Sequence, residues 1–183
     1  VTADQVTVHS GDSELTVEGV TNASAAGIGR EMVVVVDTNA RGNDNQVLDA
    51  IKAQLLTVAQ APPAGLSMAV VSAGDSALVR TPLTSDPAKL TKAVNDLTAR
   101  NGATLYNGVS RAADLFSDTP GVIRTVVVVS TGSDLGSDVT PKEAQVPLVA
   151  NGIQVVSVRY NGGDDALADL TAATAGLDAN IAS

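Results

Sequence analysis

The chain has no cysteine among its 183 residues, a single histidine (His9) and only 2% aromatic residues. Without cysteine it can form no disulfide and no thiolate metal site, although this leaves the cellular compartment open. One histidine, expected in an exposed hairpin, is too little for most nucleophilic triads. Few aromatic rings exclude the stacking platforms that bind single-stranded nucleic acids. The composition therefore argues against an enzyme and against nucleic acid as a partner.

The chain also lacks the long apolar runs and glycine-rich loops that define other classes. No stretch reaches the roughly 20 apolar residues that cross a bilayer, so this segment is not expected to insert into a membrane. No Gly-Lys-Ser or Gly-Lys-Thr occurs, and Gly27-Ile28-Gly29 precedes a strand instead of following one, so nucleotide-binding loops are absent. The net charge of -9 opposes binding to phosphate backbones and favours cations or basic partner surfaces.

What is present is a short apolar strand that ends in a carboxylate. The run Met32 to Arg41 reads Met-Val-Val-Val-Val-Asp-Thr-Asn-Ala-Arg and places Asp37 directly after four valines. A strand without polar alternation must be covered on both faces, as in a parallel sheet with helices on each side. Ligands of such sheets bind beyond the carboxyl ends of the strands, which is where Asp37 is expected to lie.

The hydrophobic pattern divides the chain into an N-terminal β-hairpin and linker, residues 1–29, and an α/β domain, residues 30–183. The hairpin is expected from strands at 5–9 and 14–20. After the first domain strand, further strands are expected at 66–72, 77–80, 124–130 and 153–159, the last being the final strand. Helices are expected at 46–60, from Asp86-Pro87 onward, at 105–116, after the capping box Thr140-Pro141-Lys142-Glu143, and at 164–175. Pro147 should kink or shorten the fourth helix, which should stop at Asn151-Gly152.

These elements predict an α/β fold: a Rossmann-like, doubly wound sheet of about six strands with helices on both faces, preceded by the β-hairpin. The sheet should be mostly parallel, because strands alternate with helices. One antiparallel edge strand is expected, since 66–72 and 77–80 flank the tight turn Ala73-Gly74-Asp75-Ser76.

Three motifs lie at the ends of predicted strands or the start of a predicted helix: Val-Val-Val-Val-Asp-Thr-Asn-Ala-Arg, then Asn-Gly-Ala-Thr-Leu-Tyr-Asn-Gly-Val, then Val-Val-Val-Val-Ser-Thr-Gly-Ser-Asp. In this order they resemble the von Willebrand factor type A domain, an adhesion module of integrins and many bacterial surface proteins. The resemblance covers roughly residues 30–176, and the composition is most similar to bacterial members.

The resemblance implies a metal-ion-dependent adhesion site that this chain keeps only in part. In the family, Asp-x-Ser-x-Ser, a threonine and a second aspartate hold Mg²⁺ or another divalent cation, which a carboxylate of the partner completes. This chain keeps Asp37 and Thr104, while Asn39 and Arg41 replace the serines and Thr131 replaces the second aspartate. Arg41 offers no acceptor and carries a fixed positive charge, so it could take the place of the metal beside Asp37.

The preferred interpretation is therefore a non-enzymatic protein-binding module, for adhesion or assembly, with a degenerate and metal-free site and no cofactor. Its ligand-binding face would contain Asp37, Asn39, Arg41, Thr104, Thr131 and Asp134. One alternative is a metal-dependent adhesion receptor that binds Mg²⁺, Mn²⁺ or Ca²⁺ through Asp37, Asn39 and Thr104, with Asp134 or Asp44 as an added carboxylate. Another is a structural subunit of a bacterial membrane secretion or pilus assembly. In each case we expect an extracytoplasmic or cell-surface location, as a fragment of a larger membrane-anchored or secreted protein.

Two features have a structural as well as a functional interpretation. Asp37 and Arg41 could form an ion pair that only stabilises the sheet edge. The acidic residues Asp134, Asp138, Asp164 and Asp165 could attract a basic partner or a loosely held Ca²⁺, but a solvated loop surface is the simpler expectation.

Overall fold

The central element is a six-stranded mixed sheet, seen in a computed structural model that describes residues 2–21, 25–39, 45–160 and 162–181. In spatial order its strands are β5 (Ala77–Thr84), β4 (Leu66–Ala73), β3 (Arg30–Asp37), β6 (Ile123–Ser130), β7 (Gln154–Tyr160) and β8 (Leu177–Ile181). All neighbours pair in parallel except β4 and β5, which form the expected antiparallel edge. The predicted fold class is confirmed.

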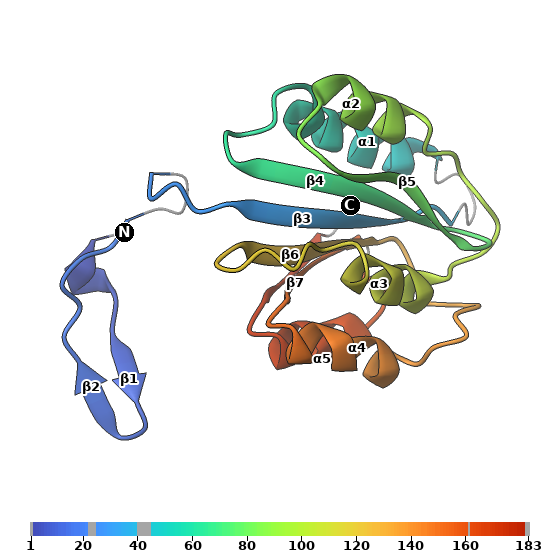
Figure 1. Cartoon of the computed structure of the whole chain (residues 1–183). Helices are drawn as coiled ribbons and strands as arrows, with labels where there is room; N and C mark the ends of the chain where they lie inside the picture. Colours follow the sequence, from blue (N-terminus) through green and yellow to red (C-terminus); the bar gives the residue numbers. More distant parts are fainter. Residues whose placement is uncertain (1, 22–24, 40–44, 161, 182–183) are drawn as a thin grey trace.

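Helices cover both faces of the sheet, which explains the uninterrupted valines of β3 (Figure 1). Helices α1 (Asn45–Gln60) and α2 (Pro87–Asn95) pack over Val34 and Val36, whereas Val33 and Val35 point to the opposite face. That second face is covered by α3 (Leu105–Ala113), α4 (Pro141–Ala150) and α5 (Ala166–Ala173). Since successive side chains of a strand alternate between faces, every position of the run is buried.

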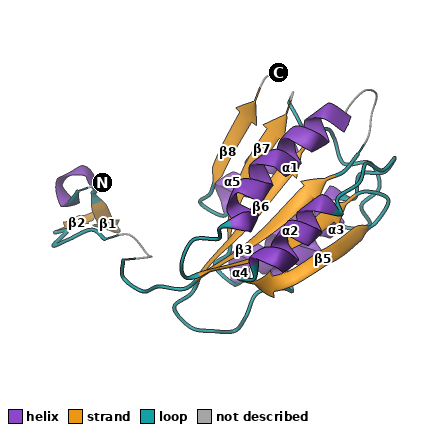
Figure 2. Ribbon diagram, turned by 90° about the horizontal axis from the view of Figure 1, so that it is seen from above, coloured by secondary structure: helices purple, strands orange, loops and turns teal. Residues whose placement is uncertain are grey.

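The N-terminal hairpin is present but shorter than predicted. Its strands are β1 (Val8–Ser10) and β2 (Ser13–Leu15), after a 3-10 turn η1 at Ala3–Gln5, and all six strand residues are exposed. Within the described part of the chain, neither strand contacts a helix or strand of the large sheet, and the hairpin stands apart from it in Figures 1 and 2. A two-stranded hairpin is at best marginally stable alone.

The sequence analysis missed β8, because it ended the sheet at 153–159. This short edge strand exposes Leu177 and Ile181 and carries polar residues between them, so it lacks the apolar run that marks the central strands. An ion pair holds it in place instead. The guanidinium of Arg159 on β7, only 9% exposed, donates to both carboxylate oxygens of Asp178, at 2.9 and 2.7 Å.

Most helix boundaries agree with the sequence, with two exceptions. Asp86 caps α2 through Ala88 N, and the capping box at Thr140 begins α4 as predicted. Helix α4 continues through Pro147 to Ala150, so the proline does not shorten it and the helix stops at Asn151, as expected. Helix α3 ends at Ala113 rather than near 116, and α5 is shorter than 164–175. No helix among the described residues is long and apolar enough to cross a membrane.

Candidate functional site

The site is built around Asp37, the last residue of β3, at the carboxyl edge of the sheet. Asp37 is 1% exposed, and its Oδ2 accepts hydrogen bonds from Thr131 N at 3.0 Å and Thr131 Oγ1 at 2.9 Å. Its Oδ1 accepts from Asn39 N at 2.9 Å. The structure therefore joins Asp37 and Thr131 directly, because β3 and β6 are adjacent strands.

Burial raises the pKa of Asp37, since the charged form loses hydration. The hydrogen bonds from Asn39 and Thr131 oppose this rise, and the negative charge of Asp134 adds to it. Asp37 is thus a buried carboxylate held by neutral donors.

Asn39 and Thr104 lie at the same edge and present oxygen atoms without partners. Asn39 is 6% exposed and Thr104 is 5% exposed, and neither Asn39 Oδ1 nor Thr104 Oγ1 has a hydrogen-bond partner among the described residues. Their positions are set by the backbone: Asn39 bridges to Arg100, and Thr104 N donates to Gly74 O. Buried unpaired acceptors are costly, which marks this edge as a place where a further group can bind.

Asp134 reaches this edge but is turned toward helix α3. Its Oδ1 accepts from Leu105 N and Ser137 Oγ, both at 2.6 Å, and its Oδ2 accepts from Ser137 N at 3.1 Å. It thereby caps α3 in place of Thr104, whose side chain makes no capping bond. A carboxylate at a helix N-terminus is favourable because the unpaired N–H groups there carry partial positive charge.

Asp164 ties the loop after β7 to Tyr106 of α3 and to Asp134. Tyr106 Oη donates to Asp164 Oδ1 at 2.7 Å, and Asp134 N donates to Asp164 Oδ2 at 2.8 Å. Burial, together with the hydrogen bond to Asp164, raises the pKa of the Tyr106 hydroxyl. The expectation of a solvated acidic surface is therefore wrong for Asp134 and Asp164, which hold the loops together. Sequence reasoning missed this network because its partners lie between 29 and 58 positions apart.

Arg41 and Asp44 lie outside the described residues. The ion pair between Asp37 and Arg41 and any ligand role for Asp44 stay predictions. The described partners of Asp37 are Asn39 and Thr131.

The donor set fits a divalent cation poorly. Of the three expected ligands Asp37, Asn39 and Thr104, Asp37 alone is a carboxylate, and three donors already engage its two oxygens. Thr131 contributes a hydroxyl that donates to Asp37, where the family pattern has a second carboxylate. Among the residues the structure describes, no three His, Cys, Asp or Glu side chains group as metal ligands. Hard divalent cations prefer charged oxygen ligands, and one buried carboxylate leaves half of their charge unbalanced.

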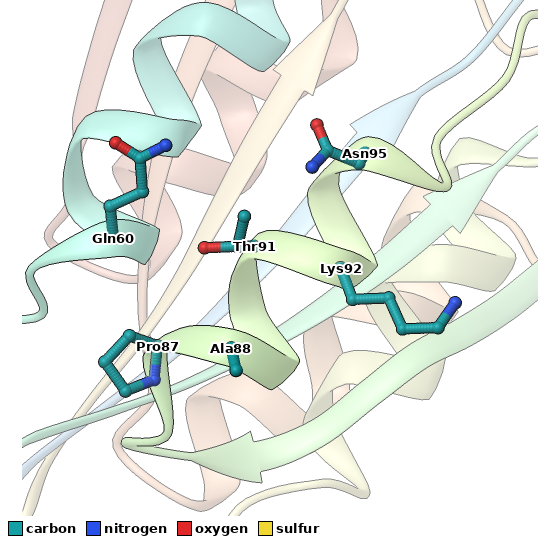
Figure 3. Close-up of a pocket in the computed structure, with 6 residues that line it drawn as sticks. All are labelled: Gln60, Pro87, Ala88, Thr91, Lys92 and Asn95. Atoms are coloured by element: carbon teal, nitrogen blue, oxygen red, sulfur yellow. The ribbon is translucent and has the colours of Figure 1, made fainter.

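A separate cavity differs from this site in its chemistry. It is an open groove of about 540 Å³ between α1 and α2 (Figure 3). Its lining residues are Gln60, Pro87, Ala88, Thr91, Lys92 and Asn95. Lys92, the charged group of this set, pairs with Asp96 on its own helix, and the groove contains no nucleophile beside a base. It gives no support to an enzymatic function.

A mixed α/β sheet with helices on both faces and polar loops at its carboxyl edge defines the class: a Rossmann-like domain, a fold in which ligands generally bind at that edge. A family model described as von Willebrand factor type A domain matches residues 32–134, more than half of the chain. The chain belongs to this family, whose members are usually non-catalytic modules that bind other proteins. Comparison with curated proteins gives no match.

Solved structures show the same fold. BatB, a conserved hypothetical protein from Bacteroides thetaiotaomicron, superposes with a TM-score of 0.71 at 15% identity, over 85% of this chain and 91% of that one. A von Willebrand factor type A protein from Catenulispora acidiphila gives a TM-score of 0.71 at 19% identity, over 84% of this chain and 39% of that one. The corresponding domain of Mfa5, a type V pili tip protein from Porphyromonas gingivalis, gives 0.66 at 13% identity, over 85% and 90%. At these identities the similarity concerns the fold alone.

Proposed function

We propose that this chain is a non-enzymatic protein-binding module, for adhesion or assembly, whose degenerate site binds its partner without a metal ion. The observation that carries the proposal is the set of hydrogen bonds on Asp37. Thr131 donates to the oxygen that a cation would otherwise share, through both its N–H and its hydroxyl. The oxygens of Asn39 and Thr104 are buried and unpartnered, and in this proposal donors of a partner protein enter this edge of the sheet to pair with them.

The proposed binding face contains Asp37, Asn39, Arg41, Thr104, Thr131 and Asp134, at the carboxyl edge of β3 and β6. The net charge of -9 favours a partner whose overall surface is basic. Residues 1–29 and 30–183 are proposed as separate units, which agrees with the lack of contacts between the hairpin strands and the described sheet elements.

The main alternative is a metal-dependent receptor that uses Asp37, Asn39 and Thr104 as ligands for Mg²⁺. The unpartnered oxygens of Asn39 and Thr104 favour this alternative, because a hard cation accepts neutral oxygen ligands. Calorimetric titration of the protein with Mg²⁺, Mn²⁺ and Ca²⁺ separates the two. The metal-free proposal predicts no saturable heat.

Two variants make that titration decisive. Thr104→Val removes one free oxygen with little change in volume, and Asp37→Ala removes the carboxylate; circular dichroism confirms that each is folded. A micromolar site in the parent protein that either variant weakens would overturn the metal-free proposal.

Protein binding itself is tested by a photo-crosslinking amino acid at Ser133, which is exposed in the loop after β6. The matched control places it at Val146, which is 63% exposed on α4. In cells of the source organism we expect a discrete crosslinked protein from position 133 that EDTA does not diminish. Equal adducts from both positions, or none from position 133, would contradict the proposal.

The structural role in a bacterial secretion or pilus assembly is kept as a second alternative, as is the extracytoplasmic or cell-surface location. Both are supported by the similarity of fold to a type V pili tip protein. In either case, the chain would act as part of a larger membrane-anchored or secreted protein. Cell fractionation with an antibody to the chain tests the location.

A further inference from the structure

A small cavity lies between the β4–β5 turn and the loop that leads to α3, and Thr38, the residue after Asp37, is among its lining residues. It has a volume of about 110 Å³, and Arg80, Arg100, Thr38 and Asp75 are among its lining residues. Pockets for drug-sized ligands measure roughly 300–1,000 Å³. This cavity therefore suits one small chemical group and not a nucleotide or a peptide strand.

The two arginines of this cavity are not paired with carboxylates. No carboxylate oxygen lies within salt-bridge distance of Arg80 or Arg100 in the described part of the chain, although acidic residues outnumber basic ones by 20 to 11. Arg80 is oriented by one hydrogen bond, from its Nε to Ser72 Oγ at 2.8 Å, which leaves its two terminal nitrogens available. Two arginines without carboxylate partners that line one cavity of an acidic protein indicate an anion site.

A buried hydroxyl supports the same conclusion independently. Thr38 is 2% exposed, and its Oγ1 has no hydrogen-bond partner among the described residues. Its backbone is fixed, because Thr38 N donates to Ala73 O and Arg100 N donates to Thr38 O at 2.7 Å. A hydroxyl held this way can donate to an oxygen that enters the cavity.

The cavity also depends on Gly74. A Cβ at this position would lie 2.7 Å from Thr38 Oγ1 and 2.9 Å from Arg100 Cβ. A side chain there would displace the two groups that define the cavity.

The net charge of the lining residues indicates which anion the cavity binds. Arg80 and Arg100 contribute two positive charges and Asp75 one negative charge, so the cavity has a net charge of one. A carboxylate balances this, whereas a phosphate group carries about two negative charges at neutral pH. We propose that this cavity binds a single carboxylate, supplied by an Asp or Glu side chain of the partner protein. The identity of the source rests on the proposed protein-binding function, but the carboxylate site does not.

The test is a titration of the whole ¹⁵N-labelled chain with sodium acetate at constant ionic strength, followed by NMR. Saturable shifts in the millimolar range are expected at the Gly74 and Arg100 amides and at Arg80 Nε. Arg100→Ala should weaken binding about tenfold, because a charge-assisted hydrogen bond is lost. Asp75→Asn should tighten it about threefold. Lys142→Ala, which removes an exposed cation on α4, should leave it unchanged.

Titrations with phosphate and with two short peptides identify the anion and its source. Phosphate that binds more tightly than acetate would overturn the choice of a carboxylate. The peptide N-acetyl-Gly-Asp-Gly-amide should bind at least as well as acetate, and its Asn counterpart should not bind. Acetate binding without binding of the Asp peptide would overturn the assignment to a partner side chain. No shift with acetate would overturn the site itself, while the crosslinking at Ser133 would still decide the proposed function.

Discussion

At the scale of single residues, Asp37 shows how the residue at the end of a neighbouring strand decides the chemistry of a buried carboxylate. Thr131 occupies the end of the neighbouring strand and donates two hydrogen bonds to the carboxylate. An aspartate there would repel Asp37 and require a cation between them, whereas a hydroxyl satisfies it directly. The site can therefore be stable with protein donors alone.

The raised pKa of Asp37 predicts a specific pH dependence of stability. Burial makes the folded protein bind this proton more tightly than the unfolded chain does. Stability should therefore fall as pH rises from the ordinary pKa of the carboxyl through its raised value in the fold. Relative to Asp37→Asn, which cannot titrate, the parent protein should lose free energy of unfolding across that window.

Urea unfolding at a series of values between about pH 3 and about pH 8 measures this difference. Asp118→Asn, at an exposed carboxylate without a hydrogen bond in the described structure, is the matched control. A difference between parent and Asp37→Asn that does not change with pH, or that changes in the opposite sense, would refute the assignment.

At the scale of elements, helix α3 links the site to the core. Asp134 caps its N-terminus, and Tyr106 in its first turn binds Asp164. Two residues later, Gly108 lets the helix approach the sheet, since a Cβ would lie 2.8 Å from Val35 Cγ1 and 3.2 Å from Ala73 Cβ. The position of the loop that carries Thr104 thus depends on a glycine in the helix that follows it.

Replacement of Gly108 should accordingly move α3 away from β3 and β4. Both contacted residues are fully buried, so they cannot yield, and Gly108→Val should cost more than about 2 kcal/mol of unfolding free energy. Gly132→Val, in a loop where a Cβ meets nothing within 4 Å, should cost less than about 1 kcal/mol. Chemical denaturation of both variants measures this, and equal losses would contradict the packing argument.

At the scale of the whole molecule, the hairpin and the sheet are joined by the chain and not by contacts between their elements. Figure 2 shows the two-stranded hairpin away from the edge and faces of the large sheet. Its strand residues are all exposed, including Val8 and Leu15 at more than 40%. The core that stabilises the fold lies entirely between the sheet and its five described helices.

Deletion of residues 1–21 should therefore leave the stability of the α/β domain nearly unchanged. The free energy of unfolding is expected to shift by less than about 0.5 kcal/mol, as for changes at exposed positions. The deletion keeps Gly29, whose carbonyl accepts from Ile123 N at the start of β6. Thermal and urea unfolding of both forms measure the difference. A loss of several kcal/mol would show that the hairpin belongs to the folding unit.

The sequence by itself determined five of the six strands of the sheet, the helices on both faces and the position of Asp37 at the end of a strand. Local patterns carry that information: an uninterrupted run such as Val33 to Val36 requires cover on both faces, and Asp86 and Thr140 mark helix starts through their own side chains. The place of Asp37 followed from its position directly after such a strand.

Only the tertiary structure decided what Asp37, Asp134 and Arg159 contact. Their partners lie far away in sequence: Thr131 for Asp37, Leu105 for Asp134 and Asp178 for Arg159. No periodicity encodes such pairs, because they arise only when parallel strands bring the ends of distant segments to one edge. For the same reason β8, which an ion pair anchors, and the cavity between Arg80 and Arg100 were visible only in the folded chain.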